Sequence, residues 1–174
     1  MKTIYLVLLL LPTVFFGQNK NAPTKAPLSI NNYIKSVDNL TLDAALELNK
    51  RVTEAADALN KKVTIAILDA SGTTILITRG DNVGPHNTEA ARRKAYTALS
   101  TKTATLLLLR NAASNPDSQN LNSLPELLLL SGGAPIYYKG NIVGSIGVAG
   151  GGSAENDDLL AKAAQILEMG ITTK

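Results

Sequence analysis

Apolar residues recur at steps of three and four between Leu42 and Leu59, which is the spacing of one face of an α-helix. Thr41 precedes this segment and has the side chain of a helix cap, and Asp43 suits the positive end of the helix dipole. The sequence therefore predicts an amphipathic helix with one buried stripe. The stripe consists of Ala45, Leu46, Leu48, Val52, Ala55, Ala56 and Leu59.

Two segments rich in β-branched residues follow, at Val63–Asp69 and Thr73–Arg79. Ser71 and Gly72 lie between them, so the pair predicts a β-hairpin. Neither set of alternate residues in the first segment is strongly polar, so we expect both faces of this strand to be covered.

Helical patterns return further along the chain. After the loop Gly80–Pro85, Asn87 has the chemistry to cap a helix whose inward positions are mainly alanine. A second helical segment is predicted at Thr103–Ala113, followed by a polar loop at Asn115–Ser123. A last helix is predicted from Ala154 to Met169, and acidic residues in its first turn favour that start.

A second hairpin is predicted near the C-terminus, where Ile136–Tyr138 and Ile142–Val148 flank the turn residues Lys139–Asn141. The order of elements is then a helix, two strands, two helices, about three strands and a helix. Strands joined by hairpins form an antiparallel sheet. The predicted fold class is therefore α+β, with a sheet of about five strands and helices packed on it.

Two leucine runs, Leu106–Leu109 and Leu127–Leu130, are apolar on every side. Burial in the core is one interpretation. An oligomer interface is the other, because the interfaces of homodimers resemble a divided core.

The N-terminus has the pattern of a secretory signal peptide. A short basic start is followed by the apolar segment Ile4–Phe16, which Pro12 interrupts and which is too short for a membrane-spanning helix. We predict a signal peptide over residues 1–17, a polar linker over residues 18–37 and one domain over residues 38–174. The mature chain is expected to be secreted, in the periplasm, and to carry no membrane anchor.

The chain of 174 residues has one histidine, His86, and no cysteine. Disulfides, thiolate-ligated metal centres and cysteine nucleophiles are therefore excluded, as is a multi-histidine metal site within one chain. Removing residues 1–17 takes away Lys2 and lowers the net charge from +3 to +2. This charge is too small to favour a nucleic-acid partner, and we interpret the cluster Arg92–Lys94 as a solvated helix face.

The glycine-rich segment Gly144–Gly152 leads from a predicted strand into a predicted helix. It matches neither the P-loop nor the dinucleotide-binding pattern, and the acidic residues Glu155, Asp157 and Asp158 would oppose a phosphate at the helix start. We expect a structural role, in which glycines let helix and sheet approach closely and permit positive φ in the turn.

Several segments in a fixed order carry a resemblance to a known family. They are Leu68–Gly72, Ile75–Arg79, Asp81–His86, Ala90–Ala98, Gly132–Ile136 and Gly140–Gly151. Together they resemble the GlcG/HbpS family, which includes the C-terminal domain of PduO-type proteins, and the likeness runs from about Thr41 to Met169. It implies a profilin-like domain that forms homo-oligomers and binds haem. Some secreted relatives are haem sensors or carriers, and the family is also labelled haem-degrading.

A haem iron ligand in the mature chain must come from a short list, because cysteine is absent. His86 comes first, since it lies between a Gly-Pro loop and a helix start; the alternative is a surface turn residue that helps to cap the helix. Tyr137 and Tyr138 should point to opposite faces of a strand, where one could ligate and the other pack. The list is His86, Met169, Tyr33, Tyr96, Tyr137 and Tyr138, of which Met169 and Tyr96 are interpreted mainly as core.

Helical spacing places Arg93 two turns after His86 on the same side, and a guanidinium suits carboxylates. We therefore predict that haem docks over Gly84–Ala98, with His86 on the iron and Arg93 or Arg79 near a propionate. Other interpretations stay open: an enzyme of haem degradation or of small hydroxy acid or carbonyl metabolism, or a ligand-free oligomeric module. No nucleophile and base can be paired from the sequence, so the enzyme interpretation rests on the family label.

Overall fold

The computed structural model describes residues 29–174. The predicted signal peptide and the first part of the predicted linker, residues 18–28, lie outside the described residues. Residues 29–35 carry a short 3-10 turn, Ile30–Asn32, and belong to a different unit from the compact one, which begins at Ser36. The compact unit is described below by itself.

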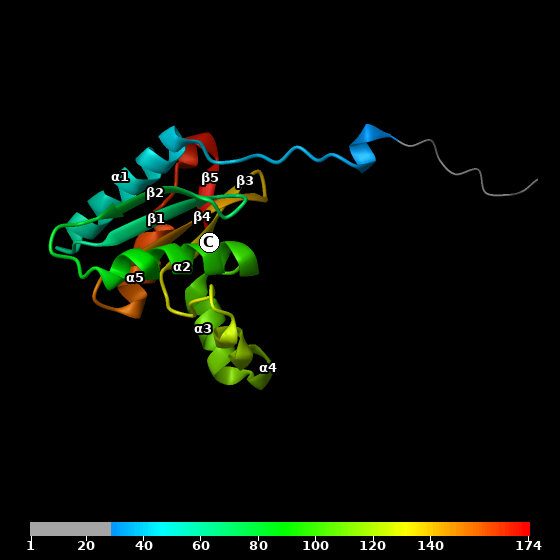
Figure 1. The fold of residues 1–174 in the computed structure, drawn as a ribbon. Helices are drawn as coiled ribbons and strands as arrows, with labels where there is room; N and C mark the ends of the chain where they lie inside the picture. The colour runs from blue at the N-terminus through cyan, green and yellow to red at the C-terminus, as the bar shows by residue number, and fades with distance from the viewer. Residues whose placement is uncertain (1–28) are drawn as a thin grey trace, which may run out of the picture. The chain divides into compact units, whose positions relative to one another are not determined.

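An open, five-stranded antiparallel sheet forms the centre of the compact unit (Figure 1). The strands are β1 (Thr64–Asp69), β2 (Thr74–Arg79), β3 (Gly133–Tyr138), β4 (Asn141–Ala149) and β5 (Ile171–Thr173). Their order across the sheet is β2-β1-β4-β3-β5, and every neighbouring pair is antiparallel. Both predicted hairpins are present, and the predicted α+β class is confirmed.

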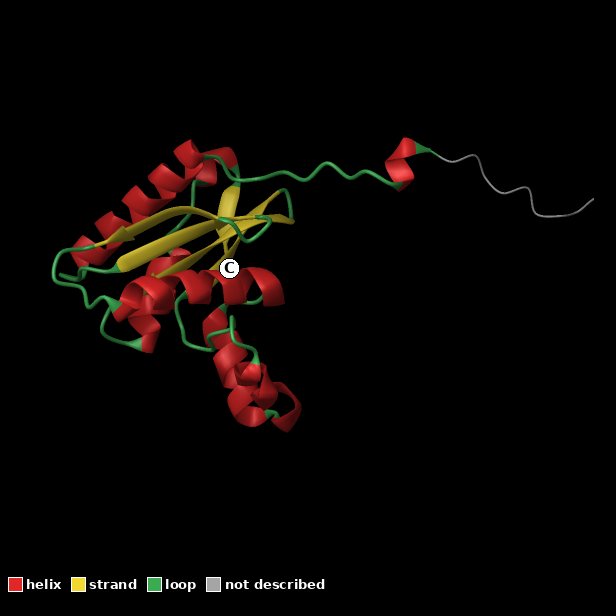
Figure 2. Cartoon of the chain, in the orientation of Figure 1, coloured by secondary structure: helices red, strands yellow, loops and turns green. Residues whose placement is uncertain are grey.

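Five helices accompany the sheet, which lies between α1 on one side and α2 on the other (Figure 2). They are α1 (Leu42–Ala58), α2 (His86–Thr101), α3 (Thr105–Ser114), α4 (Pro116–Gln119) and α5 (Ala154–Lys162). The cap predicted for the first helix is confirmed, since Thr41 Oγ1 accepts a hydrogen bond of 3.2 Å from the Ala44 amide. Both faces of β1 are covered, because its residues Thr64 to Leu68 are all buried.

The α1 face of the sheet is packed with branched aliphatic side chains. Leu48 and Val52 of α1 are fully buried and belong to the same core cluster as alternate residues of the strands. These strand residues are Ile65, Ile67, Ile136, Ile146 and Val148. The buried stripe of α1 is narrower than predicted, because Leu46 and Leu59 are exposed.

The α2 face is packed with small residues. Ala91 and Ala95 of α2 form a cluster with Ala66, Leu68 and Ala149. The helix backbone comes so close to β4 that a Cβ on Gly147 would lie 2.0 Å from the carbonyl oxygen of Ala91. The structural role predicted for the glycine-rich segment is confirmed, and two of its glycines also have positive φ, Gly150 at 107° and Gly152 at 90°.

The start of α2 differs from the prediction. The helix begins at His86 and not after Asn87, and the cap position is held by Pro85. Asn87 lies inside the first turn, where its Nδ2 donates to the carbonyl oxygen of Gly84 at 3.2 Å. Proline has φ near the helical value already, so the chain enters the helix two residues earlier than a capping Asn87 would allow.

The predicted final helix, Ala154–Met169, is too long. Helix α5 ends at Lys162, and the chain then passes through a 3-10 turn at Leu167–Met169. Gly170 has a left-handed conformation with φ of 72°, which turns the chain into β5 beside β3. Met169 is 66% exposed, so its interpretation as a core residue is wrong.

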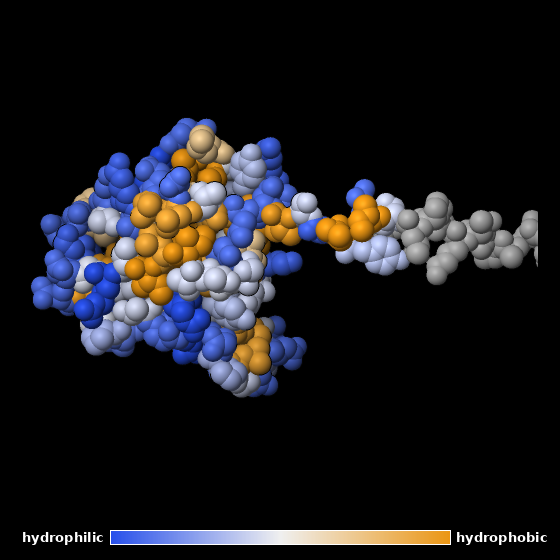
Figure 3. Space-filling model, turned by 45° about the horizontal axis from the view of Figure 1, so that its top comes forward, coloured by the Kyte–Doolittle hydropathy of each residue, from blue (hydrophilic) through white to orange (hydrophobic). Residues whose placement is uncertain are grey.

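The two leucine runs are divided between inside and outside. Leu108, Leu127 and Leu129 are buried in one small cluster, whereas Leu107 and Leu130 are more than half exposed. The run Leu127–Leu130 has no regular secondary structure. Figure 3 shows one face of the molecule, on which hydrophobic residues form an orange area flanked by hydrophilic residues. Core burial therefore explains part of each run, and an interface between copies stays a prediction.

Candidate functional site

His86 is the first residue of α2, and its side chain is exposed. The loop that leads into the helix passes close to the imidazole, because a Cβ on Gly84 would lie 2.9 Å from His86 Cε1. A glycine at this position therefore leaves room for the ring. In the part of the chain that the structure describes, no side chain caps this helix end, so capping does not explain His86.

Arg93 lies on the same helix as His86, and its guanidinium binds backbone. Its Nη2 donates to the carbonyl oxygens of Pro125 at 2.8 Å and Leu127 at 2.7 Å. Its Nε is buried and has no hydrogen-bond partner among residues 29–174. Arg93 thus fixes the segment before β3 against α2, and its contact with a propionate stays a prediction.

Arg92, the neighbouring residue, is shared between two carboxylates. Its guanidinium donates to both oxygens of Glu89, at 3.0 and 2.7 Å, and to Glu126 at 2.9 Å. The hydrogen bond from Arg92 lowers the pKa of Glu89 below its usual value, against a smaller opposing effect of burial. The start of α2 next to His86 is therefore a surface of paired charges.

Arg79 ends the edge strand β2 and is exposed. It borders a cavity of about 190 Å³ between β2 and α1, with Asp57, Lys61 and Lys62 around the same cavity. The structure therefore places His86 and Arg93 on the same helix, α2, whereas Arg79 lies on the edge strand β2 and borders the cavity next to α1.

The two adjacent tyrosines of β3 lie on opposite sides of the sheet, as strand alternation predicts. Tyr138 packs against the core of the α1 face. Tyr137 lines a separate cavity, where the Lys174 ammonium lies 5.1 Å from the centre of its ring. Tyr137 therefore borders a cavity, while Tyr138 takes part in the packing of the α1 face.

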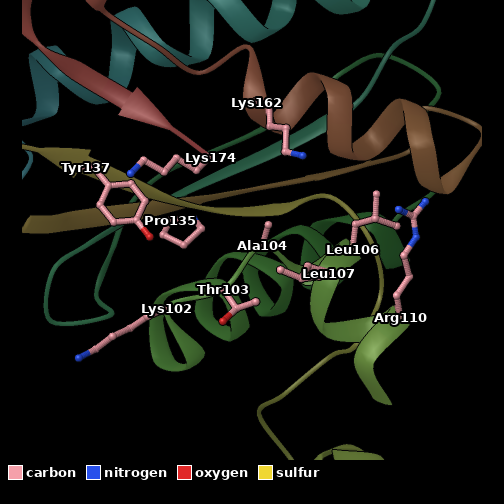
Figure 4. A pocket seen from close by; sticks show the side chains of 10 residues that line it. All are labelled: Lys102, Thr103, Ala104, Leu106, Leu107, Arg110, Pro135, Tyr137, Lys162 and Lys174. Atoms are coloured by element: carbon pink, nitrogen blue, oxygen red, sulfur yellow. The ribbon is translucent and has the colours of Figure 1, made fainter. Parts of the chain in front are cut away.

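The Tyr137 cavity has a volume of about 320 Å³ and lies between the start of α3, strand β3 and the C-terminal residues. Figure 4 shows Tyr137 and Lys174 close together, with Pro135 and Ala104 between them and Leu106. The lining residues are Lys102, Thr103, Ala104, Leu106, Leu107, Arg110, Pro135, Tyr137, Lys162 and Lys174. Sequence reasoning found Tyr137 and missed the rest, because the segments lie far apart in the chain.

Lys94 corrects the interpretation of Arg92–Lys94 as a solvated face. Its side chain is 5% exposed, and its Nζ donates to Asp157 Oδ2 at 2.7 Å and to the Val148 carbonyl oxygen at 2.9 Å. The other oxygen of Asp157 accepts from the Gly151 amide at 2.8 Å. This buried ion pair ties α2 to β4 and to the start of α5.

The domain matches a known family. A family model described as "Haem degrading protein HbpS-like" matches residues 40–165, nearly all of the compact unit. The chain belongs to the HbpS-like family. Within residues 29–174, this HbpS-like chain has no helix long and apolar enough to cross a membrane. The same residues contain no group of three or more acidic or histidine side chains placed to hold a metal ion.

Relatives of this HbpS-like chain include solved structures. A double mutant of HbpS from Streptomyces reticuli is 36% identical, with a TM-score of 0.71, over 82% of this chain and 96% of that one. A complex of PduOC with haem is 27% identical, with a TM-score of 0.68, over 78% of this chain and 98% of that one.

Two further relatives are an uncharacterised protein and a longer enzyme. An uncharacterised 15.0 kDa protein of Citrobacter freundii is 28% identical over 76% of this chain and 94% of its own length. The corrinoid adenosyltransferase PduO of Salmonella typhimurium is matched over only 38% of its length. The domain shared with PduO is thus a minor part of that enzyme.

Proposed function

We propose that this chain is a haem-binding protein. The observation that carries the proposal is the likeness of the whole domain to PduOC in complex with haem, which covers 98% of that chain. The description of the matching family as haem-degrading points to the same ligand. A bound haem would supply an iron centre that takes axial ligands and exchanges electrons.

One feature of the structure fits a bound haem, namely a side chain that can ligate its iron. His86 offers an exposed imidazole beside a glycine, and one histidine is enough for a haem axial ligand. We propose His86 as the ligand and Arg93, two turns further along the same helix, as the guanidinium near a propionate. His86 borders neither of the two cavities described above, and we propose that a second copy of the chain covers the haem there.

A hemin titration followed by absorbance tests the ligand. The wild-type protein should give a Soret band, and His86→Ala should shift that band and weaken binding by at least about tenfold. Asp81→Ala is the matched control, since it changes an exposed residue of the same loop. An unchanged band and affinity in His86→Ala would make the assignment of His86 wrong, and no Soret band in the wild type would contradict haem binding itself.

Secretion and assembly belong to the same proposal. The basic start and the apolar segment Ile4–Phe16 support export to the periplasm, and the exposed leucines of the compact unit support a homo-oligomer. We propose that the exported protein is a haem carrier or a sensor component. N-terminal sequencing of the exported protein should begin near Gln18, and light scattering with and without hemin measures the oligomer.

Haem degradation is the second candidate, favoured by the description of the family. Hemin-loaded protein is mixed with ascorbate in air, and a falling Soret band with the appearance of released iron would support it. A band that lasts as long as that of hemin-loaded albumin would favour binding alone.

A further inference from the structure

The two edges of the sheet differ in how they are protected from pairing with another strand. One edge is β5, which has three residues and is followed by Lys174. The other edge is β2, which has six residues and contains neither proline nor lysine. Short edge strands, prolines, charges and bulges are the usual means by which sheets avoid pairing at an edge. In β2 the bulge lies near the start, at Ile75, and the charge at the end, at Arg79, so its centre is open.

The backbone at the centre of β2 has groups that point away from the sheet. The Gly80 amide donates to the Val63 carbonyl oxygen at 2.9 Å, so it points toward β1. Backbone groups alternate in direction along a strand, so those of Arg79 and Ile77 point to the other side. Within residues 29–174, no strand lies on that side of β2. Ile77 therefore offers both a donor and an acceptor to another strand.

Apolar side chains flank these backbone groups on both faces of the sheet. Leu76 packs against the core of the α1 face and Ile77 against the cluster of the α2 face, and both stay partly exposed. Helix α1 lies along the same edge, because Asn49 Oδ1 accepts from the Thr78 hydroxyl at 2.6 Å. Leu46 lies one turn before Asn49 on this side of α1 and is 49% exposed. The edge is therefore an apolar strip with free backbone groups at its centre.

We propose that β2 pairs antiparallel with β2 of a second copy of this chain, across a twofold axis at Ile77. The two sheets then form one continuous sheet of ten strands, five from each copy. Ile77 exchanges both of its outward backbone hydrogen bonds with the partner's Ile77, and the two α1 helices lie next to each other and cover Leu46. This interface rests on the homo-oligomer of the proposed function and assigns it a place.

A second copy suits this edge because of where the charge lies. Antiparallel pairing at Ile77 places the two Arg79 residues about 13 Å apart along the strands. Parallel pairing would place the two guanidiniums side by side, where like charges repel each other. A twofold pair also occupies the open edge of both copies and leaves only the protected β5 edges free. The pairing therefore closes as a dimer and does not continue into a fibre.

Disulfide cross-linking tests the axis, because the chain has no cysteine of its own. In two Ile77→Cys chains the Cα atoms would lie about 5.5 Å apart, within the range that a disulfide spans. Thr74→Cys is the control, because Thr74 is more exposed but its two Cα atoms would lie about 20 Å apart. With diamide as oxidant, Ile77→Cys should form the covalent dimer at least about tenfold faster. Cross-linking that is no faster in Ile77→Cys than in Thr74→Cys would overturn the proposal.

Light scattering tests the strip beside the axis. Leu46→Lys adds a charge to this strip and should lower the molar mass by half, at a concentration where the wild type is fully assembled. Leu159→Lys is the matched control, because Leu159 lies on α5 and is 58% exposed. Circular dichroism checks that the cysteine and lysine variants are folded. The wild-type mass in folded Leu46→Lys, or an equal fall in Leu159→Lys, would contradict the place of the interface.

Hemin distinguishes the failure of this proposal from the failure of the proposed function. The pairing involves neither His86 nor Arg93, so the cross-link should form without hemin. A fast cross-link in Ile77→Cys with no Soret band in the wild type would contradict haem binding and support the interface. A Soret band in a wild type that stays monomeric would support haem binding and overturn the interface. An oligomer without the fast cross-link would support assembly and overturn the pairing of β2.

Discussion

The α1 face of the sheet is filled with leucine, isoleucine and valine, whereas the α2 face is filled with alanine, glycine and a buried ion pair. On the first face, large side chains hold helix and sheet apart. On the second, the backbone of α2 lies so close to β4 that a side chain at Gly147 would have no room. The comparison teaches that one face tolerates small changes in volume, while the other depends on close backbone contact.

The largest loss is expected from the ion pair of the α2 face. Lys94→Met leaves Asp157 buried without its partner, which should destabilise the domain by about 4 kcal/mol. Urea unfolding followed by circular dichroism measures the loss. Lys50→Met is the control, because its exposed pair with Glu54 should contribute about 0.5 kcal/mol or less. Equal losses in the two variants would show that the pair does not tie α2 to the sheet.

Gly147→Ala tests the backbone contact itself. The added Cβ would lie 2.0 Å from the Ala91 carbonyl oxygen, so α2 must move, at an expected cost of about 3 kcal/mol. Thermal unfolding by calorimetry gives the change. Gly140→Ala is the control, because it is the same replacement at a position where nothing lies within 4 Å of the added Cβ. Only the positive φ of Gly140 opposes this change, and the expected cost is about 1 kcal/mol. A smaller loss at Gly147 than at Gly140 would refute close packing as the determining feature.

Ile67→Val removes one methylene from the α1 face. Ile67 is fully buried in the core cluster, and the expected loss is about 1 kcal/mol. Equilibrium unfolding in urea is precise enough to measure it against the wild type. If this variant loses as much stability as Gly147→Ala, the two faces do not differ in tolerance.

Asp69 ends β1, belongs to the core cluster of neither face and gives the smallest effect. Partial burial tends to raise the pKa of Asp69, but hydrogen bonds from Ser71, Thr73 and Asn39 outweigh it and lower the pKa. The stability from these bonds is present above about pH 4 and is lost as the pH falls through the lower, folded pKa. Asp69→Asn should therefore reduce the loss of stability in acid, measured by urea unfolding between neutral and acid pH. A wild-type pH profile in the variant would contradict this.

Local patterns predicted most of the fold. Helix α1 and the two hairpins were predictable because a periodic stripe or a short turn determines each of them within a few residues. The end of α5 was not predictable in this way, because Ala163, Ala164 and Ile166 continue the apolar spacing of a helix beyond Lys162. Ala164 and Ile166 are instead buried in the core after the helix has ended, and Gly170 turns the chain into β5.

The candidate site was less predictable than the fold. Lys94 lies among charged residues in the sequence and is buried only because Asp157, 63 positions later, lies against it. The Tyr137 cavity is assembled from the end of α2, the start of α3, strand β3 and the last residues of the chain. His86 was proposed from the sequence because it is the single histidine, and its role as a ligand stays a prediction.

The pairing of β1 with β4 has a consequence for the time course of folding. Its register joins Thr64 to Ala149, so these two neighbouring inner strands of the sheet are separated in sequence by most of the domain. Contacts between residues so distant form late, since closing a long loop costs entropy before it gains contacts. During synthesis the β1–β2 hairpin can form early, but α2 has no β4 to cover until that strand has left the ribosome. Until then its alanine face is open to other unfinished chains.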